Sequence, residues 1–202
     1  MKSLLIFLFG FLCLSELAFS QFDANYSKKP IDQANNEPVP IYLNFSGGFD
    51  NHAGLLGIGF SVPIYDLLGI RAGIGIGAWG LKYNAGLRLS DLSRNGWGFG
   101  LGYSYCPGID ELNLTLTDDS GDTRFVDLAL LPCGSLNLSA NYHWVLSDQN
   151  VFYLETGYAI KSSNSNIYRV NNNNSLTAEE EGFLEFIRPG GIIIALGFQV
   201  AL

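Results

Sequence analysis

The chain has 202 residues, which is enough for one domain with a short tail. Its apolar content of 48% excludes disorder over most of the chain. Its net charge of −8, with no cluster of basic residues, argues against nucleic acid as a partner.

The amino terminus, residues 1–20, has the pattern of a secretory signal peptide. Lys2 supplies a positive charge, Leu4–Leu14 form an apolar segment, and Ala18-Phe19-Ser20 match the small-x-small pattern of a cleavage site. The apolar segment is too short to span a membrane as a helix, so we expect cleavage rather than an uncleaved anchor. Lipidation at Cys13 is the alternative, but Leu12 before this cysteine is larger than the small residue that a lipoprotein processing signal usually has there.

Residues 21–38 are polar, and we expect them to form a linker before a folded domain at residues 39–202. Within this domain, eight runs alternate apolar residues with polar or small ones, which is the two-residue period of a β-strand. The eight runs are Val39–Ser46, Leu56–Val62, Leu68–Ala78, Leu81–Leu89, Trp97–Tyr105, Ser135–Leu146, Phe152–Lys161 and Ile192–Leu202.

The run Ser135–Leu146 shows the two faces most clearly, with Leu138 and Trp144 on one face and Asn141 and His143 on the other. Over all eight runs the apolar face totals roughly forty residues, whereas side chains only just fill the interior of an eight-stranded barrel. The apolar face must therefore point outward. The sequence predicts an all-β fold, an eight-stranded antiparallel up-and-down transmembrane β-barrel. A soluble β-sandwich is the alternative, but it leaves a glycine- and serine-rich outer face unexplained.

The links between the runs differ in length. Pro63–Leu67, Asp91–Gly96 and Ser147–Asn150 are short, whereas the links after the fifth and seventh runs are long, as in outer-membrane barrels. Aromatic residues gather near both ends of the runs, which predicts two interfacial girdles. These residues are Trp97, Trp144 and Phe152 beside the short links, and Tyr103, Tyr105 and Tyr158 nearer the long ones.

The fifth link has the pattern of a hairpin. Leu112–Thr117 and Phe125–Leu131 flank the turn signal Asp118–Asp122. The register of such a hairpin brings Cys106 close to Cys133 and predicts a disulfide at its base. The alternatives are two unpaired thiols, or a ten-stranded barrel in which these segments are additional barrel strands.

Two acidic segments lie in the long links. We expect Ser162–Arg188, which contains Glu179–Glu181, to be a mobile acidic loop. The aspartates of the turn at residues 118–122 suggest a divalent cation site, but solvated acidic turns are commoner, so we predict no metal site and no cofactor.

Six ionisable residues fall on the inward face of the runs. We expect them to form a network of salt bridges that fills a closed interior, with Glu155 between Arg71 and Arg88; a narrow path that tolerates anions is the alternative. The six residues are Arg71, Lys82, Arg88, His143, Glu155 and Lys161.

Ser139, His143 and Glu155 also suggest a hydrolytic triad, with His143 and Glu155 as cross-strand neighbours. Ser139 and His143 are four positions apart on one strand, or about 13 Å at ~3.3 Å per residue, which is too far for a nucleophile and its base. We therefore expect no enzymatic activity.

Several of these features together resemble small bacterial outer-membrane β-barrel proteins, namely the OmpX/OmpA-like barrels and uncharacterised barrels of Bacteroidetes-type bacteria. They are the signal peptide, the alternating strands, short turns such as Pro63-Ile64-Tyr65-Asp66, and a last strand after Pro189-Gly190-Gly191. The resemblance covers residues 39–202. It implies an outer-membrane location and recognition of the last strand by the barrel-insertion machinery through Phe198, Val200 and Leu202. Leu202 replaces the usual terminal aromatic residue.

The sequence thus predicts an integral barrel, surrounded by outer-membrane lipid, with a structural or surface-interaction role. Its long links would present a disulfide-clamped hairpin to an extracellular partner. A narrow pore or carrier for small solutes is the alternative function.

Overall fold

The fold is seen in a computed structural model of the chain. The residues that it describes are 40–202 without 52, 66, 118–122, 148–149, 163–165 and 173–175. The predicted signal peptide and linker lie outside these residues, as do the aspartates of the 118–122 turn. In the described part of the chain, no helix has both the length and the apolar character needed to cross a membrane.

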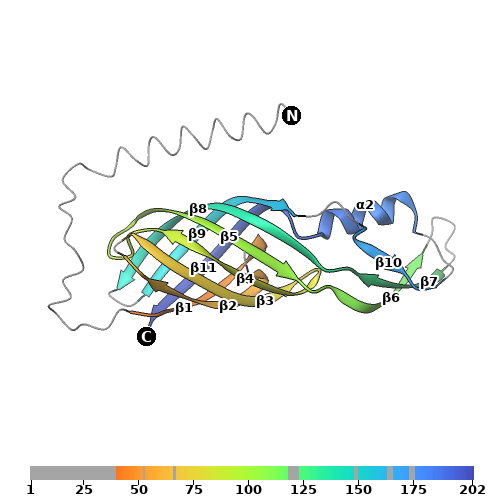
Figure 1. The fold of residues 1–202 in the computed structure, drawn as a ribbon, viewed down its shortest axis with the longest axis horizontal. Helices are drawn as coiled ribbons and strands as arrows, with labels where there is room; N and C mark the ends of the chain where they lie inside the picture. Colours follow the sequence, from red (N-terminus) through yellow and green to blue (C-terminus); the bar gives the residue numbers. More distant parts are fainter. Residues whose placement is uncertain are drawn as a thin grey trace, which may run out of the picture. The chain divides into compact units, whose positions relative to one another are not determined.

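Eight strands form a closed antiparallel barrel (Figure 1). They are β1 (Tyr42–Asn51), β2 (Gly54–Pro63), β3 (Leu68–Gly77), β4 (Gly80–Leu89), β5 (Gly96–Cys106), β8 (Cys133–Ser147), β9 (Asn150–Lys161) and β11 (Gly191–Ala201). The order around the barrel is β1-β11-β9-β8-β5-β4-β3-β2, so barrel strands that follow one another in the chain are neighbours. The predicted up-and-down barrel is confirmed. The sandwich and ten-stranded alternatives are wrong, because one sheet closes on itself without the strands of the fifth link.

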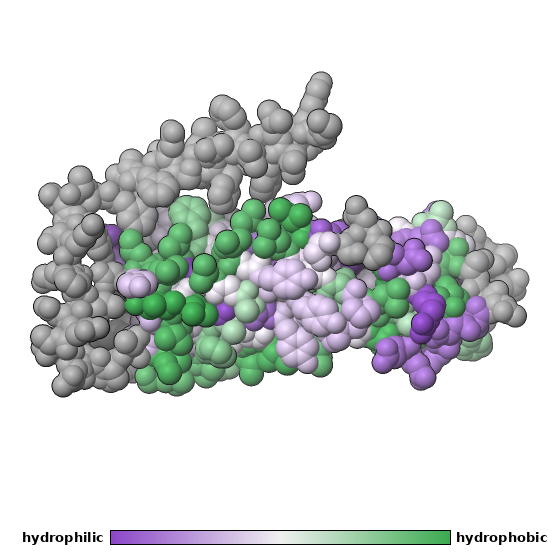
Figure 2. All heavy atoms as spheres, in the orientation of Figure 1, coloured by the Kyte–Doolittle hydropathy of each residue, from purple (hydrophilic) through white to green (hydrophobic). Residues whose placement is uncertain are grey.

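The barrel wall has an apolar outer face and a polar inner face. In β8, Leu138 and Trp144 point outward and are 39% and 37% exposed, whereas Asn141 and His143 point inward and are 2% and 0% exposed. The other barrel strands alternate in the same way, and Figure 2 shows hydrophobic side chains spread over the wall. The predicted orientation of the two faces is confirmed.

Aromatic side chains collect at two levels of the outer wall. Trp97, Tyr142, Trp144 and Phe152 follow one another across β5, β8 and β9, with successive ring centroids 5.3, 4.9 and 5.6 Å apart. A second group lies on exposed positions nearer the opposite ends of the same strands and of β4. Its members are Tyr83, Tyr103, Tyr105 and Tyr158.

The two long links, after β5 and β9, fold together beyond one end of the barrel (Figure 1). They contain β6 (Ile109–Thr117), β7 (Thr123–Leu130), β10 (Tyr168–Val170) and the helix α2 (Ala178–Ile187). The strands form a sheet in the order β10-β7-β6, and we call these four elements the projecting subdomain. The predicted hairpin is confirmed, because β6 and β7 pair antiparallel.

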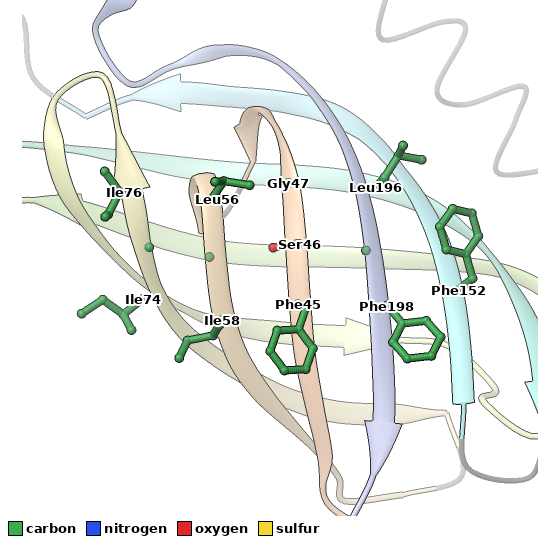
Figure 3. A pocket seen from close by; sticks show the side chains of 13 residues that line it. Phe45, Ser46, Gly47, Leu56, Ile58, Ile74, Ile76, Phe152, Leu196 and Phe198 are labelled. Carbon is green, nitrogen blue, oxygen red and sulfur yellow. The ribbon is translucent and has the colours of Figure 1, made fainter.

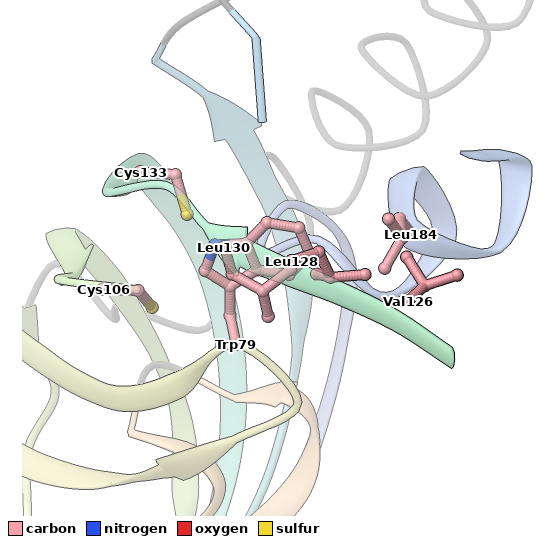
Figure 4. Packing of buried hydrophobic residues seen from close by; sticks show 7 residues of the cluster. All are labelled: Trp79, Cys106, Val126, Leu128, Leu130, Cys133 and Leu184. Carbon is pink, nitrogen blue, oxygen red and sulfur yellow. The ribbon is translucent and has the colours of Figure 1, made fainter. Parts of the chain in front are cut away.

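The projecting subdomain has its own apolar core (Figure 4). Val126, Leu128 and Leu130 alternate along β7 on one face of the sheet, and Leu184 of α2 packs against this face. Trp79, from the β3–β4 turn, joins the same core, and its Nε1 donates a hydrogen bond to the backbone oxygen of Leu131 at 2.9 Å. The core therefore attaches the subdomain to the rim of the barrel.

The interpretation of Ser162–Arg188 as a loop was wrong for the part that contains β10 and α2, whereas its mobility stays a prediction. Thr177 and Glu180 form a capping box at the start of α2: the Glu180 N–H donates to Thr177 Oγ1, and the Thr177 N–H donates to a Glu180 carboxylate oxygen. Arg124 of β7 also forms an ion pair with Glu180. The pKa of Glu180 is lowered, first by the Thr177 N–H and further by Arg124.

Candidate functional site

The interior of the barrel holds a buried ion pair between opposite walls. Arg71 of β3 and Glu155 of β9 form a salt bridge with Nη1 and Oε1 2.9 Å apart, and Glu155 is 1% exposed. Ser139 of β8 donates a hydrogen bond to the same carboxylate oxygen and accepts one from Arg71 Nη2. Gly100, which faces inward, makes room for the Arg71 guanidinium, because a Cβ at this position would lie 2.5 Å from Arg71 Nη2. A carboxylate satisfied in this way is suited to holding strands together.

Arg88 lies in the same central region with different partners. Its Nη2 donates to Asn141 Oδ1 at 3.3 Å, and its guanidinium carbon lies 5.5 Å from the centre of the Tyr153 ring. Arg71 pairs in register with Gly86 rather than with Arg88, so the two arginines are offset along their strands. Glu155 forms its salt bridge with Arg71, and its negative charge also acts on Arg88 without a direct ion pair being described between them.

The other three predicted charges lie away from this centre. Lys82 forms a buried ion pair with Asp50 at 2.8 Å at the end of the barrel that carries the projecting subdomain. Lys161 forms an exposed ion pair with Glu185 of α2, and this contact lowers the pKa of Glu185. His143 lies at the opposite end. The predicted single network is thus divided into separate groups.

His143 contacts backbone carbonyl oxygens of the β4–β5 turn, those of Asp91 at 2.7 Å and Arg94 at 2.9 Å. It pairs in register with Tyr153 rather than Glu155. With Ser139 bonded to Glu155, the arrangement lacks the Ser–His hydrogen bond that a hydrolytic triad requires.

Asp50 is a functional residue that the sequence analysis missed. Its two carboxylate oxygens accept from Lys82 Nζ and, at 2.9 Å, from the backbone N–H of Gly190. Asp50 thereby ties the segment after α2 to β1. The predicted first strand ended at Ser46, whereas β1 continues through two glycines to Asn51 and keeps Asp50 on the inward side. The alternating pattern, extended across these glycines, was the available signal.

Cys106 and Cys133 lie directly opposite each other on β5 and β8, at the base of the projecting subdomain (Figure 4). The predicted proximity is confirmed. Both are buried free thiols in this structure, so the predicted disulfide is not present in it.

An apolar hollow of about 600 Å³ lies on the outer wall (Figure 3). It forms at Gly47, which occupies an outward position without a side chain, between Leu56 of β2 and Leu196 of β11. Phe45, Ile58, Ile74 and Phe198 line the hollow as well. Its lining has the same apolar character as the surrounding wall.

The buried ion pair can be tested with Arg71→Met. This change leaves the Glu155 carboxylate buried without its cation, so we expect the free energy of unfolding to fall by about 3–5 kcal/mol. Urea titration of the refolded protein in detergent micelles measures the change.

Arg94→Met is the matched control, because the Arg94 ion pair with Asp91 is exposed. It is expected to cost less than about 1 kcal/mol. Equal losses for the two variants would contradict a structural role for the Arg71–Glu155 pair.

Comparison with known proteins adds no further assignment to this site. No protein-family model matches the chain, and no curated protein matches it significantly.

Proposed function

We propose that this chain is an integral outer-membrane β-barrel that presents the projecting subdomain outside the cell in a structural or surface-interaction role. The observation that carries the proposal is the apolar outer wall. Residues such as Leu56, Ile76 and Ile194 are more than half exposed, and each has an apolar side chain opposite it on a neighbouring strand. An apolar surface of this extent is unfavourable in water and suited to acyl chains.

The two aromatic levels support the same proposal. The Trp97–Phe152 row and the tyrosines near the other end of the strands correspond to the aromatic belts at the two interfaces of a bilayer. The predicted signal peptide would direct the chain out of the cytoplasm. The resemblance to OmpX/OmpA-like barrels agrees with this location, and the insertion machinery would read the pattern in β11.

A filled interior is part of the proposal. Long buried side chains fill the middle of the lumen, where Arg71 meets Glu155 of the opposite wall and Arg88 meets Asn141 of β8. Lys82, Asp50 and Arg188 occupy the end that carries the projecting subdomain, and all three are at most 10% exposed. This arrangement favours a structural interior over a transport path.

The surface role rests on the projecting subdomain. It has its own core, and among the described strands β6 is paired on one edge only, which leaves its other edge available to an extended segment of a partner. Phe125, Phe183 and Phe186 are at least 60% exposed on the same subdomain. A disulfide between Cys106 and Cys133, formed in an oxidising compartment, would fix its base.

Gel migration of outer-membrane fractions tests the barrel, its location and the disulfide. We expect the unheated protein to migrate faster than the boiled protein in these fractions. In boiled, unreduced samples, Cys106 and Cys133 should not react with a thiol-reactive polyethylene glycol, and both should react after reduction. Absence from the outer membrane would contradict the proposed location, and reactive thiols before reduction would contradict the disulfide.

Surface labelling tests the orientation. Thr115→Cys on β6 and Ser93→Cys in the β4–β5 turn replace exposed residues at opposite ends of the barrel. In a background with Cys106→Ser and Cys133→Ser, a membrane-impermeant maleimide should label intact cells at position 115 and should label position 93 only after lysis. The reverse pattern would place the projecting subdomain in the periplasm.

A narrow pore for small solutes is the alternative function, and planar-bilayer recording distinguishes the two. We expect the refolded protein to give no steady conductance steps, because buried side chains fill its interior. Steady steps that change with Arg88→Ala would favour the pore, since only a conducting lumen responds to an interior charge.

A further inference from the structure

The centre of the barrel interior carries one more positive charge than its carboxylate balances. Glu155 is engaged by Arg71 and Ser139. Arg88 is 5% exposed, and its side-chain contacts within the described residues are with neutral groups, the amide of Asn141 and the ring of Tyr153. Leaving a buried charge uncompensated is strongly unfavourable in a protein interior.

Unsatisfied polar atoms surround the same place. Arg88 Nε, Ser61 Oγ, Asn44 Oδ1 and Gln199 Oε1 are buried without a hydrogen-bond partner, and the four residues are each at least nine-tenths buried. All four line one small cavity inside the barrel, together with Arg71 and Glu155, and the cavity has room for roughly one water-sized molecule. Because the four unsatisfied atoms belong to residues that line the same cavity, we attribute them to one bound species rather than to four unrelated missing hydrogen bonds.

The donors and the charge decide the chemistry of that species. The Arg88 Nε–H and the Ser61 hydroxyl both donate hydrogen bonds. The unsatisfied amide atoms of Asn44 and Gln199 are oxygens, which accept hydrogen bonds. Rotating each amide group by half a turn exchanges its oxygen with its NH2 group, which then donates at the same position. A cation would add to the excess positive charge, and sulfate or phosphate would exceed the space. A monatomic anion satisfies the donors and neutralises the charge.

We infer that this cavity is a halide site, occupied by chloride under physiological conditions. Arg88 supplies the charge, and Ser61, Asn44 and Gln199 complete the coordination from β2, β1 and β11. The ion would thus join β4 to β2 and to the pair β1 and β11, where the first and last barrel strands meet. The inference does not depend on the proposed surface role, because it concerns only the barrel interior.

Crystals of the full, detergent-refolded protein grown in sodium bromide test the site directly. We expect an anomalous difference peak between Arg88 Nε and Ser61 Oγ. An ordered water at this position without an anomalous signal would overturn the inference, and so would an empty cavity. This measurement uses the natural sequence and is independent of whether any variant folds.

Thermal unfolding gives a second readout. At constant ionic strength, replacing sodium gluconate by sodium chloride should raise the unfolding temperature of the natural protein by on the order of 5 °C. Arg88→Met and Ser61→Ala should lose most of this rise, whereas Arg94→Met, which removes an exposed arginine, should keep it. An unfolding temperature of the natural protein that does not respond to chloride would overturn the inference.

Discussion

The rest of this structure depends on the limited volume inside an eight-stranded barrel. Side chains at alternate positions must point inward, and the interior accommodates long residues only where small ones face them. A Cβ on Gly197 would lie 2.1 Å from Cζ of Tyr153, and Gly100 makes equivalent room for Arg71. Inward glycine and serine thus leave space for a few long polar side chains. Bulky apolar residues are accommodated on the outer wall.

The same confinement governs the interior charges. Arg71–Glu155 links β3 to β9, and Lys82–Asp50 links β4 to β1, so each buried pair joins strands that are not neighbours in the barrel. Breaking such a pair leaves a charge in a site that water reaches poorly, and the pairs therefore hold the two sides of the barrel together. Arg88 departs from this pattern, and the halide inference accounts for the departure.

Beyond the barrel, the projecting subdomain is fixed to the rim at several points. Trp79 holds the end of the hairpin through the Leu131 carbonyl, and Asp50 holds the segment after α2 through the Gly190 N–H. Phe49 of β1 also contacts Phe186 of α2, with ring centroids 6.0 Å apart. A subdomain held in this way keeps the free edge of β6 in one position, which suits the proposed surface role.

The eight barrel strands, the outward apolar face and the hairpin could all be predicted from the sequence, because a two-residue period is a local property of each strand. The proximity of Cys106 and Cys133 followed from the same register argument. Partners across the lumen could not be predicted in this way. Whether Glu155 meets Arg71 or Arg88 depends on the register of several strands and on how the barrel closes.

The structure of Ser162–Arg188 also depends on tertiary contacts. The capping residues Thr177 and Glu180 were visible in the sequence, but the large apolar residues of α2 all lie in its second half, after a long polar stretch, and we interpreted the link as a polar loop. Only the apolar face of β7, built from a different link, provides the surface on which Leu184 is buried. The alternation along each strand can thus be predicted from the sequence. Contacts between distant segments cannot, because they form only when the closed barrel brings those segments together.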